Sequence, residues 1–402
     1  MLKDRIKSLA QAYKQEVIDL RRHLHSHPEL SFQEFQTAAF VAEKLKAIGI
    51  TEIESKATTG WSALIKGKNP EKKVVALRAD MDALPIQEAS GAEWSSTKPG
   101  LMHACGHDGH TAMLLAAAHH LAHNAEFDGT LNLIFQPAEE GPPGDEEGGA
   151  PLMIKEGVMD NPKVDAVFGL HISSALEIGK IKYKSGSVMA SSDWFTIKIK
   201  GKQTHGSTPW TGIDPIVVGT QIINNLQTIV SRQQDLTIAP VVITVGKFHS
   251  GIRANIIPET AELVGTIRTL DSKMQKDVHE KIKLVAKNVA EAWGAEVEVN
   301  IDTKTLVTYN DPALVAAMVP SLERAAGKGN ATAGIWTTGA EDFSFFGVKA
   351  PAFFFNLGGM PKGMDPSKAA PHHTPDFFID DSMLDVGVKA FCNLVFDFSA
   401  NK

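Results

Sequence analysis

The chain has 402 residues, a formal net charge of −7 at pH 7, 43% hydrophobic residues and 22% charged residues. This composition is typical of a globular protein with a large core, and the length favours two or three domains. A negative charge without any cluster of Lys and Arg gives no electrostatic reason to expect nucleic acid or an anionic membrane, and favours a small molecule as the partner.

The N-terminal segment, residues 1–25, has the apolar spacing of an amphipathic helix from Leu9 to Leu20 and lacks the apolar core of a signal peptide. No apolar run reaches the length of about 18 residues that a membrane span requires. The two cysteines, Cys105 and Cys392, cannot form a disulfide framework and fit a reducing compartment. We therefore expect a cytoplasmic protein with no membrane partner.

Strand-like runs rich in β-branched residues alternate with helical spacing through the first part of the chain and return near its end. This alternation predicts an α/β domain with a mostly parallel central sheet flanked by helices. The runs are WSALIKG (61–67), KKVVALRAD (72–80), GTLNLIFQPAEEG (129–141), DAVFGLHI (165–172) and PAFFFNLG (351–358), with a helix after Asp108.

The pattern changes from about Ser187, where strands and helices follow one another in the order βαββαβ. We expect an inserted α+β domain over residues 187–303, and a second domain formed by residues 1–186 and 304–402. The inserted elements are strand 193–202, helix 214–233, strands 239–251 and 260–270, helix 273–294 and strand 296–304.

Cys105 and His107 stand in the segment MHACGHDGHTAM (102–113), directly before the helical run. A thiolate and an imidazole two positions apart can converge from a turn onto one divalent ion. In isolation, the segment favours a free cysteine packed at the start of a buried helix.

Glu139 and Glu140 follow a predicted strand and the chain-turning Pro137, so they lie at the carboxyl end of the strand, where open α/β sheets place their sites. One carboxylate could bind a metal while its neighbour meets the activated water. The alternative is a solvated acidic turn, which is the expected state of Glu146 and Glu147.

Other metal-binding residue types end neighbouring strands of the same predicted sheet. Asp80 and Asp82 share one face of a strand, and two carboxylates that face the same way favour a cation or solvent between them. His171 ends another strand, and a loop bracketed by prolines presents His372 and His373. Each residue alone is typical of an ordinary strand end, but their common location at one edge indicates one site.

The chain resembles the two-metal amidohydrolases and exopeptidases that include aminoacylase, hippurate hydrolase and zinc carboxypeptidases, and is most similar to the N-acyl-amino-acid and hippurate hydrolase branch. The similarity runs in order from about residue 20 to residue 385. It rests on RRHLHSHPELSFQE (21–34), LRADMDALP (77–85), MHACGHDGHTAML (102–114), FQPAEEG (135–141), GLHI (169–172), GIRANIIPETAELVGTIRTLD (251–271), GAEDFSFF (339–346) and HHTPDFFID (372–380).

The resemblance implies two divalent ions per subunit, with zinc, manganese, cobalt or nickel as the candidates. It assigns Glu139 as the catalytic base and Asp82 as the carboxylate that orients the site, and leaves the role of Asp80 open. His373 is preferred to His372, because a small polar residue and Pro follow it in the branch pattern. The implied metal ligands are Cys105, His107, Glu140, His171 and His373; His103 and His110 are expected to be supporting or structural groups.

The resemblance also implies that residues 1–186 and 304–402 form the catalytic, metal-binding domain. It implies that the inserted domain is a lid that carries substrate-binding residues and forms a homodimer. His205 matches a histidine that reaches the substrate, often across a dimer interface. Asn255 and Arg268 match positions that bind the substrate carboxylate or polarise its carbonyl. Trp210 departs from the commoner histidine of this branch, which leaves the fine substrate preference open.

The implied reaction is hydrolysis of the amide bond of an N-acyl amino acid or a related peptide-like substrate, with Glu139 moving the proton. A dipeptidase or carboxypeptidase with the same site is the alternative, because pocket walls set substrate choice. A non-catalytic binding protein is disfavoured because Glu139 and the ligands are all retained. A structural zinc module is disfavoured because the ligand set is rich in carboxylates.

Overall fold

A computed structural model describes residues 14–144 and 146–400 of the chain. The chain forms two compact units. Unit 1 contains residues up to 186, residues 309–335 and residues from 345 onward. Unit 2 contains residues 187–308 and 336–344.

Unit 1 is built on an eight-stranded mixed sheet with the order β1-β2-β4-β3-β5-β16-β6-β15. The central neighbours β4-β3, β3-β5 and β5-β16 are parallel, whereas β1-β2, β2-β4 and β16-β6 are antiparallel. Both faces of β3 and β4 are buried, as expected for parallel strands covered on both sides. The strands are β1 (Glu52–Lys56), β2 (Gly60–Lys66), β3 (Val74–Asp80), β4 (Thr130–Gln136), β5 (Ala166–Glu177), β6 (Ile181–Tyr183), β15 (Ala331–Ala333) and β16 (Ala352–Met360).

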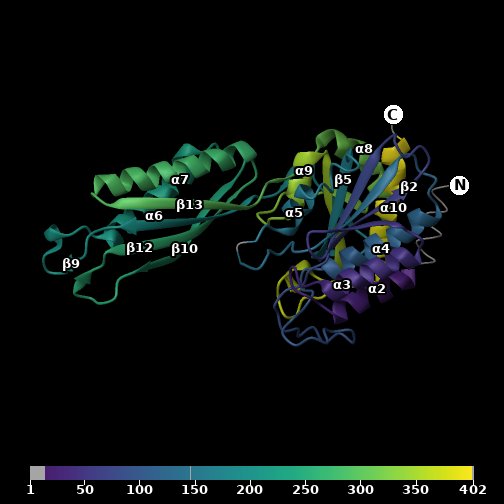
Figure 1. Cartoon of the computed structure of the whole chain (residues 1–402), viewed down its shortest axis with the longest axis horizontal. Coiled ribbons are helices and arrows are strands. Elements are labelled where there is room, and N and C mark those ends of the chain that lie inside the picture. The colour runs from purple at the N-terminus through teal and green to yellow at the C-terminus, as the bar shows by residue number, and fades with distance from the viewer. Residues whose placement is uncertain (1–13, 145, 401–402) are drawn as a thin grey trace. The chain divides into compact units, whose positions relative to one another are not determined.

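Helices flank this sheet (Figure 1). Helix α4 is buried along nearly its whole length, because its apolar and alanine-rich sequence packs against α2 and α10 as well as the strands. The expected N-terminal helix is present as α2, but Leu9 lies outside the described residues. The helices are α2 (Lys14–Ser26), α3 (Phe35–Ala47), α4 (His107–His123), α5 (Gly149–Lys155), α8 (Pro312–Ala326), α9 (Phe346–Lys349) and α10 (Asp385–Ala400).

Unit 2 contains an antiparallel four-stranded sheet with the order β10-β12-β8-β13. Helices α6 and α7 cover one face and form a separate apolar core with it (Figure 1). Asp214 and Asp271 cap the two helices by accepting main-chain N–H groups of their first turns. The elements follow in the order β8 (Ser192–Lys200), α6 (Pro215–Gln233), β10 (Val241–Ser250), β12 (Thr260–Thr269), α7 (Ser272–Ala292) and β13 (Glu296–Thr305).

The predicted fold class is confirmed: one unit is an α/β layer with a largely parallel centre, and the other has the βαββαβ order. Among residues 14–144 and 146–400, no helix is both long and apolar enough to cross a membrane. The remaining short elements are β7 (Gly186–Met189), β9 (Thr204–His205), β11 (Ile256–Ile257), β14 (Thr308–Asn310) and 3₁₀ turns at Pro209–Thr211, Asp342–Phe345, Pro366–Lys368 and Asp381–Met383.

Candidate metal centre

The carboxyl ends of β3 and β4, together with the middle of β5, bring most of the predicted site residues together. Because these strands are parallel neighbours, the chain segments that follow them meet at one edge of the sheet. His171 does not end its strand as expected, because β5 (Ala166–Glu177) continues beyond it. Helix α4 begins at the same edge after Gly106, whose φ is +106°. A side chain on Gly106 would place its Cβ 2.2 Å from Ile172 Cγ2, so only glycine lets this loop approach β5 so closely.

The thiol of Cys105 lies at the middle of the site. Its Sγ is 3.3 Å from Nε2 of His171 and 3.3 Å from Nε2 of His373. Burial and the nearby carboxylates of Glu140, Glu139 and Asp80 raise the pKa of the thiol well above its usual value. A thiolate therefore requires added positive charge at this position, and divalent cations provide it.

His107 is fully buried among carboxylates. Its Nε2 is 3.7 Å from Asp80, 3.8 Å from Glu139 and 3.9 Å from Glu140, yet it has no hydrogen-bond partner among the described residues. Burial lowers the pKa of His107, but the charges and hydrogen bonds of the surrounding carboxylates outweigh it and raise this pKa to about 10. The pocket thus combines excess negative charge with an unpaired nitrogen, which fits a cation.

Asp82 fixes the orientation of His107. Nδ1 of His107 lies 2.9 Å from the main-chain oxygen of Asp82 and 3.2 Å from its Oδ1. Since these oxygens accept, Nδ1 carries a proton, and Nε2 is the nitrogen directed into the pocket, where a bound cation would replace its proton. The other oxygen of Asp82 accepts from the main-chain N–H of Glu140 at 2.9 Å and from the Ser31 hydroxyl at 2.8 Å.

His171 has the same arrangement. Its Nδ1 lies 2.6 Å from the main-chain oxygen of Ile172, so this nitrogen donates and Nε2 faces Cys105 with its lone pair. Burial, with the charges of nearby histidines, lowers the pKa of His171 well below its usual value, so the ring is neutral. A neutral imidazole is the form that binds a metal.

Possible donor groups join His107 to Asp80 and His110, and to Glu139 and Glu140, but two groups share Cys105. Within each group the donor atoms lie within 4.8 Å of one another. One group contains Cys105, His107 and His171, and the other contains Cys105, Glu140 and His373. This mixture of thiolate, imidazole and carboxylate fits two adjacent divalent ions of the zinc type.

His372 and His373 have different surroundings, although they are adjacent. Nδ1 of His372 donates to the main-chain oxygen of Cys105 at 3.0 Å, and its Nε2 accepts from the Ser174 N–H at 3.2 Å. Both ring nitrogens are thereby occupied, and burial lowers the pKa of His372 to about 4. His373 instead directs Nε2 to Cys105 Sγ and to Glu140 Oε1, the latter at 3.1 Å.

Asp80 and His110 form a support behind the ligand groups. Nδ1 of His110 donates to Asp80 at 2.6 Å, and its Nε2 accepts from the Ile172 N–H at 2.8 Å, so neither nitrogen is available to a metal. The second oxygen of Asp80 accepts from Arg78 at 2.6 Å. Burial raises the pKa of Asp80, but the Arg78 charge and the nearby histidines outweigh it and lower this pKa well below its usual value.

Sequence reasoning missed Arg78 and Ser31. A signal for Arg78 existed in the sequence. Arg78 is the one charged residue within an apolar strand before Asp80, and it shares a face with Asp80 because the two are two residues apart. His103, expected to be supporting, is buried, and burial lowers its pKa to about 4. It belongs to none of the ligand groups.

The predicted substrate-binding residues all lie in unit 2. β9 and β11 pair, and the Gly206 N–H donates to the Asn255 main-chain oxygen at 2.9 Å, so the segments of His205 and Asn255 lie side by side. His205 is exposed, and its Nδ1 accepts from the Ser207 N–H at 3.1 Å. Arg268 is half-buried near the far end of β12 and is not part of this pair.

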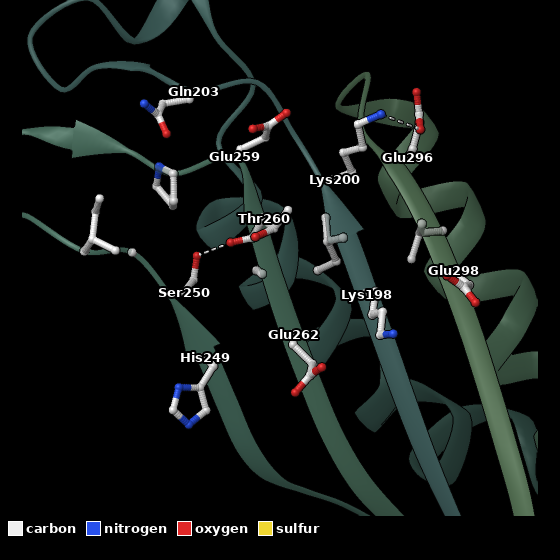
Figure 2. A pocket seen from close by; sticks show the side chains of 16 residues that line it. Lys198, Lys200, Gln203, His249, Ser250, Glu259, Thr260, Glu262, Glu296 and Glu298 are labelled. Carbon is white, nitrogen blue, oxygen red and sulfur yellow. Dashed lines mark hydrogen bonds and ion pairs between the residues drawn. The ribbon is translucent and has the colours of Figure 1, made fainter.

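A groove of about 830 Å³ lies on the face of the unit 2 sheet that the helices leave open. Figure 2 shows the side chains that line it. Lys198, Lys200, Glu262 and Glu298 project into it from adjacent strands, and His249 lines its edge. Lys247 and Glu262 pair across β10 and β12 at 3.2 Å. The lining contains neither His205, Asn255 nor Arg268, so the groove is separate from the predicted substrate contacts.

Comparison with known proteins gives consistent matches. The model of the family described as "Peptidase family M20/M25/M40" matches residues 76–397. "Thermostable carboxypeptidase 2" of Saccharolobus solfataricus is 38% identical over 99% of both chains. "N-acyl-L-amino acid amidohydrolase" of Geobacillus stearothermophilus is 46% identical over 77% of this chain and 83% of the relative. The crystal structure of Bacillus subtilis YXEP protein, described as a dinuclear metal binding peptidase from the M20 family, is 35% identical, covers 96% of this chain and 98% of its own, and has a TM-score of 0.81.

Proposed function

The chain belongs to the peptidase family M20/M25/M40 and is a metal-dependent hydrolase of amide C–N bonds, and we propose that its substrates are N-acyl amino acids. The family resemblance expected from the motifs is thereby confirmed. The observation that carries the proposal is the pair of ligand groups that share Cys105. The relative with 46% identity, an N-acyl-L-amino acid amidohydrolase, supports the substrate class.

We propose that Cys105, His107 and His171 hold one divalent ion, and that Cys105, Glu140 and His373 hold the other. Zinc, manganese, cobalt and nickel are the candidates for both positions. Bound cations of this kind supply a water molecule acidic enough to lose a proton near neutral pH, and they polarise the scissile carbonyl.

Glu139 is the proposed general base and acid. Its Oε2 lies 3.8 Å from His107 Nε2, so the carboxylate borders the ligand groups. Glu139 removes the proton from the attacking water and then delivers it to the leaving amine, a role worth about 10²–10⁴-fold in rate. The hydrogen bonds from Nδ1 of His107 to Asp82 keep Nε2 directed into the pocket.

We further propose that unit 2 is a lid in which His205, Asn255 and Arg268 bind the substrate carboxylate or the developing oxyanion, and through which the chain forms a homodimer. The exposed edge strand β10 and the exposed His205 loop support a role in contacts with ligand or partner. We also propose a cytoplasmic location, for which the two free cysteines are the support.

A substrate panel tests the proposed function. The metal-loaded enzyme should hydrolyse N-acetyl and N-benzoyl amino acids or indole-acyl conjugates with a higher kcat/KM than dipeptides. Chelation should abolish this turnover, and added manganese, cobalt, nickel or zinc should restore it. Full activity after verified metal removal would overturn the two-metal mechanism.

A carboxypeptidase is the second candidate, because a thermostable carboxypeptidase is 38% identical over nearly the whole chain. Preferred cleavage of N-blocked dipeptides at the C-terminal residue, with little hydrolysis of N-acyl amino acids, would favour this alternative.

A further inference from the structure

The turn after β4 holds its main chain in an unusual conformation. Ala138 has a φ of +51°, in the left-handed region that residues with a side chain rarely adopt. Glu139 and Glu140 follow it directly. A conformation of this kind persists only where the surroundings hold it, so contacts to Ala138 decide where the two carboxylates point.

Glu34 makes the main contact. Its Oε1 accepts from the Ala138 N–H at 2.9 Å, and its Oε2 accepts from the Thr59 hydroxyl at 2.6 Å. The side chain is fully buried and comes from a segment 104 residues earlier in the chain. Although Glu34 directly precedes α3, its side chain makes no capping hydrogen bond to that helix.

The next contact along the turn has the same form. The Glu140 N–H donates to Asp82 Oδ2 at 2.9 Å. Buried carboxylates therefore accept from the main-chain N–H groups of Ala138 and Glu140, the residues on either side of Glu139. The Ala138 oxygen in turn accepts from the Gly149 N–H at 3.3 Å. A side chain on Gly149 would bring its Cβ within 1.7 Å of the Pro137 oxygen, which shows how closely the chain packs on this turn.

We propose that Glu34 is a positioning residue that fixes the main chain at Ala138 and thereby directs Glu139 and Glu140 into the metal centre. No hydrogen bond or ion pair joins Glu34 to a proposed ligand among the described residues, so it acts through the main chain of the turn. This inference rests on the proposed function for its effect on turnover. Its effects on the turn and on metal affinity can be measured without a substrate.

Two substitutions separate the hydrogen bonds from the charge. Glu34→Ala leaves the buried Ala138 N–H without an acceptor, and the turn can move. A displacement of about 1 Å at a catalytic group can lower the rate about 10²-fold, so kcat should fall by about that factor with little change in KM. Glu34→Gln can still accept from Ala138 and donate to the Thr59 oxygen, so it should retain most of the rate.

Glu29 provides a matched control in the same segment. It is also buried, and one of its oxygens accepts from the N–H groups of Gln36 and Thr37 at 2.9 and 2.8 Å. These contacts support the start of α3 and do not involve the turn. Glu29→Ala should therefore lower the melting temperature without a selective loss of kcat or metal affinity.

Hydrogen exchange of the Ala138 amide, cobalt affinity and steady-state kinetics complete the test. Glu34→Ala should lose protection at Ala138 and bind cobalt about tenfold or more weakly, the usual effect of removing a group that supports a ligand. Glu34→Gln and Glu29→Ala should resemble wild type in both readouts. If Glu34→Ala fails to fold, Thr59→Val replaces it, because it removes only the donor to Oε2 and should give smaller losses in the same direction.

The inference would be overturned if Glu34→Ala had the same Ala138 exchange, cobalt affinity and kcat as wild type. It would also be overturned if Glu34→Gln lost as much cobalt affinity and kcat as Glu34→Ala. If wild type hydrolyses no N-acyl amino acid, the proposed substrate class fails. The exchange and cobalt readouts would still support or overturn the role of Glu34 in that case.

Discussion

The His372 ring donates through Nδ1 to the main-chain oxygen of Cys105 at 3.0 Å. With Nε2 also occupied by Ser174, His372 supports the Cys105 loop and offers no lone pair to a metal. We predict that His373→Ala retains one divalent ion per chain, whereas His372→Gln retains two and loses about 10- to 100-fold in activity, as for other supporting groups. Metal analysis after dialysis measures the difference, and the reverse pattern would assign the ligand to His372.

Glu139→Gln tests the proposed base. The amide cannot accept a proton from water at neutral pH, so kcat should fall about 10²–10⁴-fold while both ions stay bound. Glu147→Gln is the control, because Glu147 is exposed on the following loop and pairs only with Lys155 at 3.3 Å among its described ion pairs. Near-native turnover in Glu139→Gln, with metal content verified, would remove Glu139 from this role.

The sequence predicted the metal-ligand candidates better than the residues that hydrogen-bond to them. Strand periodicity and chain order brought Glu140 and His171 to one predicted sheet edge, because parallel strands share the edge at which they end. The partners of each imidazole could not be predicted in this way. The hydrogen bonds that occupy His110 and His372 come from residues distant in the chain, and adjacent histidines have the same residue type but different environments.

Some features of the fold could likewise be predicted from the sequence and others could not. The βαββαβ order of unit 2 is visible in the sequence because each amphipathic element has its own periodicity. Membership of residues 336–344 in unit 2 depends on long-range contacts that leave no periodic signal. Glu34 was likewise invisible as a positioning residue, because a carboxylate before a helix usually indicates helix capping.

Cys105→Ala should abolish binding of both ions, because Cys105 is common to the two ligand groups. Metal content should fall from two ions per chain towards none, and activity should fall with it. Cys392→Ala is the control: this buried thiol lies in the α10 core and should affect stability alone, by about 1–2 kcal/mol. Retention of two ions by Cys105→Ala would contradict a shared thiolate ligand.

Glu34 should give the metal-free protein a pH-dependent stability. Burial and the charge of Asp82 raise the pKa of Glu34 from 4.5 to about 7, so the folded state holds a proton between these values that the unfolded state releases. The contribution of Glu34 to the free energy of unfolding is therefore fully present below about pH 4.5, and it falls by about 3 kcal/mol as the pH rises towards 7. Glu34→Gln lacks this titration, so its stability relative to wild type should increase from pH 5 to pH 8 in urea unfolding with a chelator present. Glu147→Gln controls for removal of one negative charge, and a difference between Glu34→Gln and wild type that stays constant from pH 5 to pH 8 would contradict the raised pKa of Glu34.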